Sequence, residues 1–99
     1  MKTKIENGVM TVYLNGEIDH HTARPAREKI DSEISKAEPK VLVLDFSDVT
    51  FMDSSGVGLV MGRYKYSAAK NCRTQVRGLN ERDKKIMLLS GLSKLVDFK

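Results

Sequence analysis

One stretch decides the fold: FMDSSGVGLVMGRYK, which runs from Phe51 to Lys65. Its first two residues are apolar and belong in the core, and an acid and two hydroxyl side chains follow them. Asp and Ser at a helix start satisfy free backbone amides and suit the positive end of the helix dipole. A helix N-terminus also accommodates phosphate groups. We therefore predict that Ser54 projects its hydroxyl outward from the point where a helix begins.

The segments on either side of this turn have distinct patterns. A helix is predicted over Ser55–Lys70, with an apolar stripe made of Val57, Val60, Met61, Tyr64 and Ala68. Before the turn, Val41–Phe46 is an apolar run without alternation. Such a run is typical of a strand covered on both faces, in the middle of a sheet flanked by helices. The residues Ser47–Thr50 are then expected to form a loop.

The N-terminal part of the chain predicts two strands and a helix. The strands cover Thr3–Glu6 and Val9–Asn15 and are joined by an Asn-Gly pair, a favoured hairpin turn. Alternation in the second strand buries one of its faces. Gly16–His21 is predicted to connect this strand to a helix over Ala23–Ala37, with Thr22 as the N-cap. The apolar stripe of that helix is Ala26, Ile30, Ile34 and Ala37.

The C-terminal part predicts a further strand, a helix and a short final strand or tail. These elements cover Thr74–Arg77, Glu81–Ser90 and Leu95–Phe98, with Asn80 as the helix cap and Gly91 as its terminator. Two strands come first in the chain, and helices and strands then alternate. This order predicts an α/β domain with a mixed sheet and helices packed on it.

Composition limits the possible function classes. The 99 residues, 40% of them hydrophobic, are enough for one domain, and we expect no second domain. The net charge of +4 comes from scattered basic residues with acids nearby, which indicates a solvated surface and no direct nucleic-acid binding. No apolar run approaches the ~20 residues of a membrane span. The single cysteine, Cys72, excludes an internal disulfide and suits a reducing cytoplasm.

The glycines of the central stretch do not form a nucleotide-binding loop. The dinucleotide pattern G-x-G-x-x-G would need a glycine where Met61 stands, and no Gly-Lys-Ser/Thr follows. Because Gly58 and Gly62 are four residues apart, they lie on one helix face. We interpret them as small residues that allow a neighbouring element to approach closely.

Catalysis and metal binding are also disfavoured. Ser54 could suggest a nucleophile beside His20 or His21, but the pattern Gly-x-Ser-x-Gly fails because Met52 replaces the first glycine. Adjacent histidines seldom converge on one metal ion, even with Asp19 beside them. We therefore predict a protein that is not an enzyme and that holds neither a metal ion nor a cofactor.

Two blocks of the sequence resemble a known family. FMDSSGVG at residues 51–58, continued by GRYK at residues 62–65, resembles the signature of the bacterial anti-sigma factor antagonists of the STAS family. GEIDHHTA at residues 16–23 resembles a second block, found in the sporulation branch of that family, the anti-sigma F factor antagonists. The order of the predicted elements agrees with this family over nearly all of the chain.

This resemblance implies a fold and a function. The implied STAS fold is a single domain over residues 1–99, with a mixed sheet of four or five strands and helices packed mainly on one side. The implied partner is both an anti-sigma factor and a serine protein kinase, which the unphosphorylated antagonist captures in the cytoplasm, so that the sigma factor is freed. The kinase then phosphorylates Ser54, and a PP2C-type serine phosphatase restores the hydroxyl. The implied partner-binding residues are Asp19, Asp53, Ser55, Gly56, Val57 and Arg63.

A second interpretation stays open. The chain could be a STAS subunit of a membrane lipid-transport or transporter complex. The same surface would then serve a permanent subunit contact, and no kinase would act on it.

Overall fold

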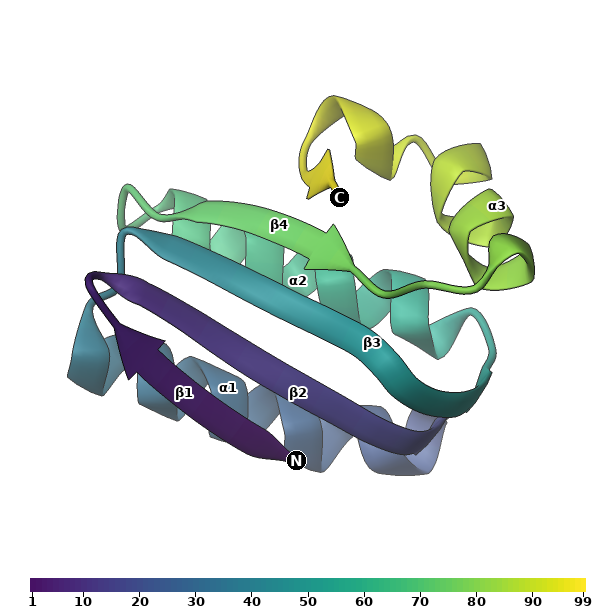
Figure 1. Cartoon of the computed structure of the whole chain (residues 1–99), viewed down its shortest axis with the longest axis horizontal. Helices are drawn as coiled ribbons and strands as arrows, with labels where there is room; N and C mark the ends of the chain where they lie inside the picture. Colours follow the sequence, from purple (N-terminus) through teal and green to yellow (C-terminus); the bar gives the residue numbers. More distant parts are fainter.

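The computed structural model describes all 99 residues and shows a five-stranded sheet with three α-helices (Figure 1). The elements are, in order, β1 (Lys2–Glu6), β2 (Val9–Ile18), α1 (His20–Ala37), β3 (Val41–Met52), α2 (Ser55–Ala68), β4 (Arg73–Arg77), α3 (Glu81–Leu89), a 3-10 turn (Leu92–Lys94) and β5 (Asp97–Phe98). Each strand and helix predicted from the sequence is present, although several begin or end at other residues.

The strands lie in the order in which they occur in the chain, β1-β2-β3-β4-β5. β1 runs antiparallel to β2, as the predicted hairpin requires, and the remaining neighbours pair in parallel. α1 and α2 form the crossovers between parallel strands, and both lie on the same face of the sheet (Figure 1). α3 stands beyond the end of β4 (Figure 1). The predicted mixed sheet with helices mainly on one side is therefore confirmed.

The core lies between the sheet and the two crossover helices. β2 and β3 contribute alternate apolar side chains to it, and α1 contributes Ile30 and Ile34, which are completely buried. The sheet residues of this core include Met10, Val12, Leu14, Leu42, Leu44 and Phe46. The predicted alternation in β2 and the apolar stripe of α1 are thus confirmed at their central positions, since spacings of two and of three to four residues put these side chains on one face.

The central strand β3 differs from its prediction in two ways. It extends to Met52, so the residues Ser47–Thr50 form strand and not a loop. They do so because the second half of β2 continues to pair with β3 across two register irregularities: Asn15 and Gly16 lie opposite Asp48 and Val49 after the first, and Ile18 lies opposite Met52 after the second. Helices also cover only one face of β3. On the other face, the buried Val43 and Asp45 are shielded by side chains of neighbouring strands.

An ion pair covers part of this open face. Arg77 on β4 donates from Nε to Oδ2 of Asp45, at 2.7 Å, and its guanidinium carbon lies 5.9 Å from the centre of the Tyr13 ring. Oδ1 of Asp45 accepts from the amide of Ser47 at 2.8 Å. Burial raises the pKa of Asp45, but the bonds from Arg77 and Ser47 outweigh burial and leave that pKa below its ordinary value.

The buried face of α2 includes most of the predicted stripe: Val60 is buried, and Val57, Met61 and Tyr64 are partly buried and pack against the core. Its buried residues are Gly56, Leu59, Val60, Arg63 and Ser67, whereas Ala68 is exposed. Gly56 belongs to this face as well, and a β-carbon at that position would collide with the side chain of Met52. The helix therefore begins close against the end of β3. The predicted role of Gly58 and Gly62 is wrong: a β-carbon added at either would meet nothing within 4 Å, so no neighbour approaches them closely.

Alanine substitutions at Gly56 and Gly62 test the difference between a crowded and an open position on α2. We expect Gly56→Ala to lower the free energy of unfolding by about 1–3 kcal/mol, because Met52 is fully buried and cannot move aside without disturbing the core. Gly62→Ala, in the same helix, should raise it by about 0.5–1 kcal/mol, since alanine favours the helix and meets open space. Urea denaturation of both variants measures this. Equal effects would show that Met52 does not restrict position 56.

The Asp45–Arg77 pair gives a pH-dependent contribution to stability. Because the pKa of Asp45 is lowered by folding, its stabilising effect is complete above the ordinary value of 3.8 and is lost as the pH falls through the lower folded-state value. We expect Asp45→Asn to cost about 1–2 kcal/mol at pH 7. The difference from the original protein should shrink at pH 3, as measured by urea unfolding at both pH values. A difference that grows on acidification would contradict this assignment.

Candidate partner-binding site

Ser54 stands at the junction between β3 and α2 with its hydroxyl free. It is exposed and is the N-cap residue of α2, with φ −61° and ψ −15°, but its side chain makes no capping hydrogen bond. Its carbonyl accepts from the amides of Val57 and Gly58, at 3.1 and 3.3 Å. The backbone of Ser54 therefore starts the helix while its side chain remains available. The predicted outward position of this serine is confirmed.

Asp53 provides the cap that Ser54 does not. Its carboxylate accepts from the amide of Ser55 at 2.8 Å, and its carbonyl accepts from the amide of Gly56 at 3.0 Å. Its own amide donates to the carbonyl of Ile18 at 3.1 Å, which fastens the turn to the end of β2. Asp53 thus holds the turn in place, and the start of α2 does not depend on the hydroxyl of Ser54.

Asp19 is the corresponding residue at the end of β2. It is the N-cap of α1, and its carboxylate accepts from the amides of His21 and Thr22, at 2.9 and 3.0 Å. The Thr22 hydroxyl accepts in return from the amide of Asp19 at 3.0 Å, which completes a capping box. The helix therefore begins at His20, and the prediction that Thr22 is the N-cap is wrong. These bonds, that from the amide of Thr22 most of all, lower the pKa of Asp19.

The sheet brings these two turns together. Ile18 and Met52 are paired neighbours in parallel strands, so Asp19 and Asp53 follow the same edge of the sheet. Both crossover helices start there, each with an acidic cap. We call this edge, with Asp19, Asp53 and Ser54, the capped edge. The sequence placed each acid in a turn, but only the strand pairing shows that the turns are adjacent.

The other predicted partner-binding residues differ in their exposure. Ser55 and Val57 are partly exposed, whereas Gly56 and Arg63 are buried. Gly56 packs on Met52, and the Arg63 side chain is only 5% exposed. Their burial leaves Gly56 and Arg63 little surface for direct contact with a partner, and it gives both residues structural roles that the sequence did not indicate.

Arg63 joins the two crossover helices. Its Nε lies 2.7 Å from Oδ1 of Asp31 on α1, a carboxylate that is 25% exposed. Burial and, to a smaller degree, the like charge of Arg27 lower the pKa of Arg63, while Asp31 acts in the opposite direction. Sequence reasoning missed this pair. A signal for it was present, because Arg63 lies on the same side of the helix as Leu59 and Val60, which are core residues.

A groove runs between α1 and α2 beside the capped edge. It has a volume of about 580 Å³. It is lined by His20, Ala23, Arg24, Arg27, Ser55, Gly58, Leu59, Gly62 and Arg63. The open space beside Gly58 and Gly62 is therefore this groove, and four of its lining side chains carry a basic group.

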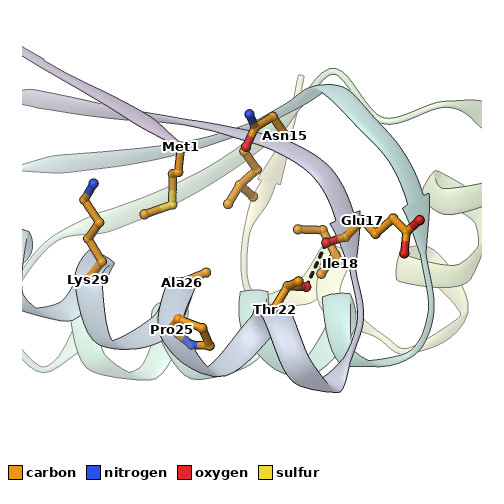
Figure 2. Close-up of a pocket in the computed structure, with 9 residues that line it drawn as sticks. Met1, Asn15, Glu17, Ile18, Thr22, Pro25, Ala26 and Lys29 are labelled. Carbon is orange, nitrogen blue, oxygen red and sulfur yellow. Dashed lines mark hydrogen bonds between the residues drawn. The ribbon is translucent and has the colours of Figure 1, made fainter.

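A second hollow, of about 340 Å³, lies between α1 and β2 (Figure 2). Met1, Ile18, Pro25 and Ala26 line it, together with the stem of Lys29, so its surface is mostly apolar. The Thr22 hydroxyl donates to the Glu17 carbonyl at 2.7 Å at one end of it (Figure 2). None of the predicted site residues lines this hollow.

Other candidate groups are separate from the capped edge or have no chemical partner. The exposed rings of His20 and His21 stack on each other with centroids 3.9 Å apart. No three His, Cys, Asp or Glu side chains gather in a way that could hold a metal ion. Cys72 is buried, and burial raises the pKa of its thiol, which makes it unreactive. No helix has both the length and the apolar character needed to cross a bilayer.

Comparison with known proteins agrees with this geometry. The family model described as "STAS domain" matches residues 1–99. A curated relative, the anti-sigma F factor antagonist of Paenibacillus polymyxa, is 37% identical over 90% of this chain and 76% of its own length.

Two solved structures of the anti-sigma factor antagonist SpoIIAA are each 30% identical and match 99% of this chain. Its unphosphorylated form has a TM-score of 0.84 over 86% of its chain. Its phosphorylated form, from Bacillus, has a TM-score of 0.77 over 89% of its chain.

The buried pair in this region predicts an asymmetry between two substitutions. Asp31→Asn should lower the free energy of unfolding by about 3 kcal/mol, because it leaves the Arg63 guanidinium buried without its counter-charge. Arg63→Met should cost less, since it removes the buried charge and leaves a carboxylate that is partly exposed to water. Chemical denaturation of both variants measures the difference. A larger loss in Arg63→Met would show that packing of the arginine stem outweighs its charge.

Proposed function

The chain belongs to the STAS domain family, and we propose that it is an anti-sigma factor antagonist controlled by phosphorylation of Ser54. In its unphosphorylated form it binds a cytoplasmic protein that is both an anti-sigma factor and a serine kinase, and the sigma factor is thereby released. The kinase then transfers phosphate to Ser54, and a PP2C-type phosphatase removes it. The chain itself acts as a binding protein and not as an enzyme.

The observation that carries this proposal is the free hydroxyl of Ser54. It is exposed, it makes no hydrogen bond that modification would break, and it stands at a helix start that Asp53 caps independently. A kinase can therefore reach it without unfolding the domain. The relatives support the same interpretation, because SpoIIAA, at 30% identity, has been described in both an unphosphorylated and a phosphorylated form.

The physical effect of the phosphate differs between the free protein and the complex. Phosphorylation adds about −1.5 to −2 charges at pH 7. In the free protein the N-terminus of α2 tolerates this charge, with an effect of roughly 0.3–1 kcal/mol per unit charge. In a complex docked on the capped edge, one like-charge pair ~6 Å apart costs about 3 kcal/mol at an effective dielectric constant near 20. That energy corresponds to an affinity loss on the order of a hundredfold.

The capped edge supplies the rest of the proposed interface. Asp19 and Asp53 are already engaged with backbone amides, so their carboxylates are held in fixed positions. These fixed carboxylates suit basic or hydrogen-bond-donating groups of the partner, whereas the partner group that faces the neutral Ser54 hydroxyl is proposed to be an acid, which repels a phosphate at that position. We propose that Ser55 and Val57, which are partly exposed, contribute the remaining contacts.

Charge at Ser54 should change binding and leave folding intact. We expect Ser54→Asp to weaken binding to the anti-sigma factor/kinase from the same genome by about tenfold or more, with a melting temperature close to the original. Ser54→Ala should bind with unchanged affinity and resist the kinase. Ser93→Asp is the matched control, because it adds the same charge at an exposed serine in the 3-10 turn Leu92–Lys94. Calorimetry and thermal melts measure these effects, and a Ser54→Asp protein that unfolds would assign the residue to folding instead.

A direct kinase experiment tests the site of modification. Incubation with that kinase and ATP, followed by mass spectrometry, should place one phosphate on Ser54. The Ser54→Ala variant should take up none, whereas Ser55→Ala should still carry its phosphate on Ser54. Binding to a transport complex without any phosphate uptake would favour the subunit interpretation over the regulatory one.

A further inference from the structure

Arg82, the second residue of α3, lies against the junction between β3 and α2. Its Nη1 donates to the carbonyl oxygen of Met52, at 3.4 Å, and to Oδ1 of its neighbour Asp83, at 2.9 Å. Met52 is the last residue of β3, and Ser54 follows it by two positions. Figure 1 shows α3 at the same end of the molecule as this junction. The fold therefore brings a cation from a distant part of the sequence close to the serine.

The spacing between the two side chains suits contact through a phosphate. Two residues of chain span at most about 7 Å, so Ser54 cannot lie further than this from Met52 along the backbone. The Arg82 side chain is 65% exposed, and the Ser54 side chain is exposed as well. A phosphoryl group extends outward from the serine hydroxyl. We therefore expect a change of side-chain rotamer to be enough to bring the guanidinium and the phosphate together.

The guanidinium of Arg82 has donors to spare. An arginine carries five N–H groups, and both contacts of Arg82 within the protein use Nη1. Its Nε and Nη2 make no hydrogen bond to another residue, and the exposed side chain presents them to water. Arg82 can therefore bind an anion while it remains paired with Asp83.

The surroundings of Ser54 otherwise carry acids. Asp53 precedes it, and Asp19 follows the neighbouring strand at the same edge of the sheet. A phosphate on Ser54 adds about −1.5 to −2 charges beside these carboxylates. Guanidinium and phosphate form bidentate, charge-assisted hydrogen bonds, which offset that repulsion. Because Asp83 already compensates the charge of Arg82, this attraction acts at contact and not at long range.

We propose that Arg82 binds the phosphate on Ser54 within the same molecule, through Nε and Nη2, and thereby ties α3 to the start of α2. This inference rests on the proposed phosphorylation of Ser54 and adds a consequence for the antagonist itself. In the unphosphorylated protein, Arg82 holds only the Met52 carbonyl and Asp83. After phosphorylation the same side chain bridges two helices, so the modified protein differs in α3 as well as at the serine.

The test uses protein in which genetically encoded phosphoserine replaces Ser54, so that no kinase is needed. ³¹P NMR measures the pKa of the second ionisation of the phosphate, which is ordinarily about 6. We expect this pKa to be higher in Arg82→Gln than in the protein that keeps Arg82, because the guanidinium favours the dianion. Hydrogen exchange of the α3 amides should be slowed by phosphorylation about two- to fivefold, the effect of a contact between exposed charges, and Arg82→Gln should abolish this slowing.

Two further variants serve as controls. Arg73→Gln removes the same charge from the start of β4, at the opposite edge of the sheet, and should leave the phosphate pKa and the α3 exchange rates unchanged. Arg82→Gln leaves Asp83, whose side chain is only 4% exposed, without its counter-charge. Circular dichroism shows whether that variant folds. If it does not, Arg82→Gln combined with Asp83→Asn removes both charges and decides.

Two results would overturn the proposal. A phosphate pKa that is the same with and without Arg82 would show that the two groups do not meet. Equal changes in Arg82→Gln and Arg73→Gln would show a general effect of net charge. Failure of the proposed function is seen separately, because a kinase that leaves Ser54 unmodified does not affect the measurement on encoded phosphoserine.

Discussion

The parallel pairing of β2 with β3 is the constraint on which the rest of the structure depends. It continues through two irregularities until Ile18 lies opposite Met52, and both strands then turn into helices. Because parallel strands end at the same edge, the two helix starts and their acidic caps become neighbours. Ser54 takes its position from this pairing, and so does the groove between the helices.

The sequence predicted much of the fold because its local signals agree with one another. The alternation in β2, the apolar run of β3 and the Asn80 cap of α3 all lead to the observed elements. The exposed position of Ser54 was also predictable, because an acid and two serines after an apolar pair are typical of a helix start. The prediction from sequence was wrong at the start of α1, where two nearby residues could each serve as the N-cap. Asp19 and Thr22 are both good N-caps, and only the capping box shows that they act together.

The remaining features could not be predicted because they depend on pairs distant in the sequence. The polar sequence of Ser47–Thr50 predicts a loop, but pairing with β2 holds this segment in a strand. From the sequence alone, Arg63 is expected on the surface. In the structure its charge is offset by the carboxylate of Asp31 on α1, which allows it to be buried. Gly58 and Gly62 lie on the side of α2 that faces open space. The groove is thus a result of tertiary packing that helical periodicity does not show.

The two margins of the sheet also affect how other proteins can approach it. β5 has only two residues, and β1 exposes the charged side chains of Lys2, Lys4 and Glu6. Short or charged border strands discourage a foreign chain from extending a sheet by backbone pairing. Backbone pairing at its flanks is therefore disfavoured as a way for another protein to bind this domain. The same two margins lower the risk that the domain is drawn into fibrous aggregates through its sheet edges.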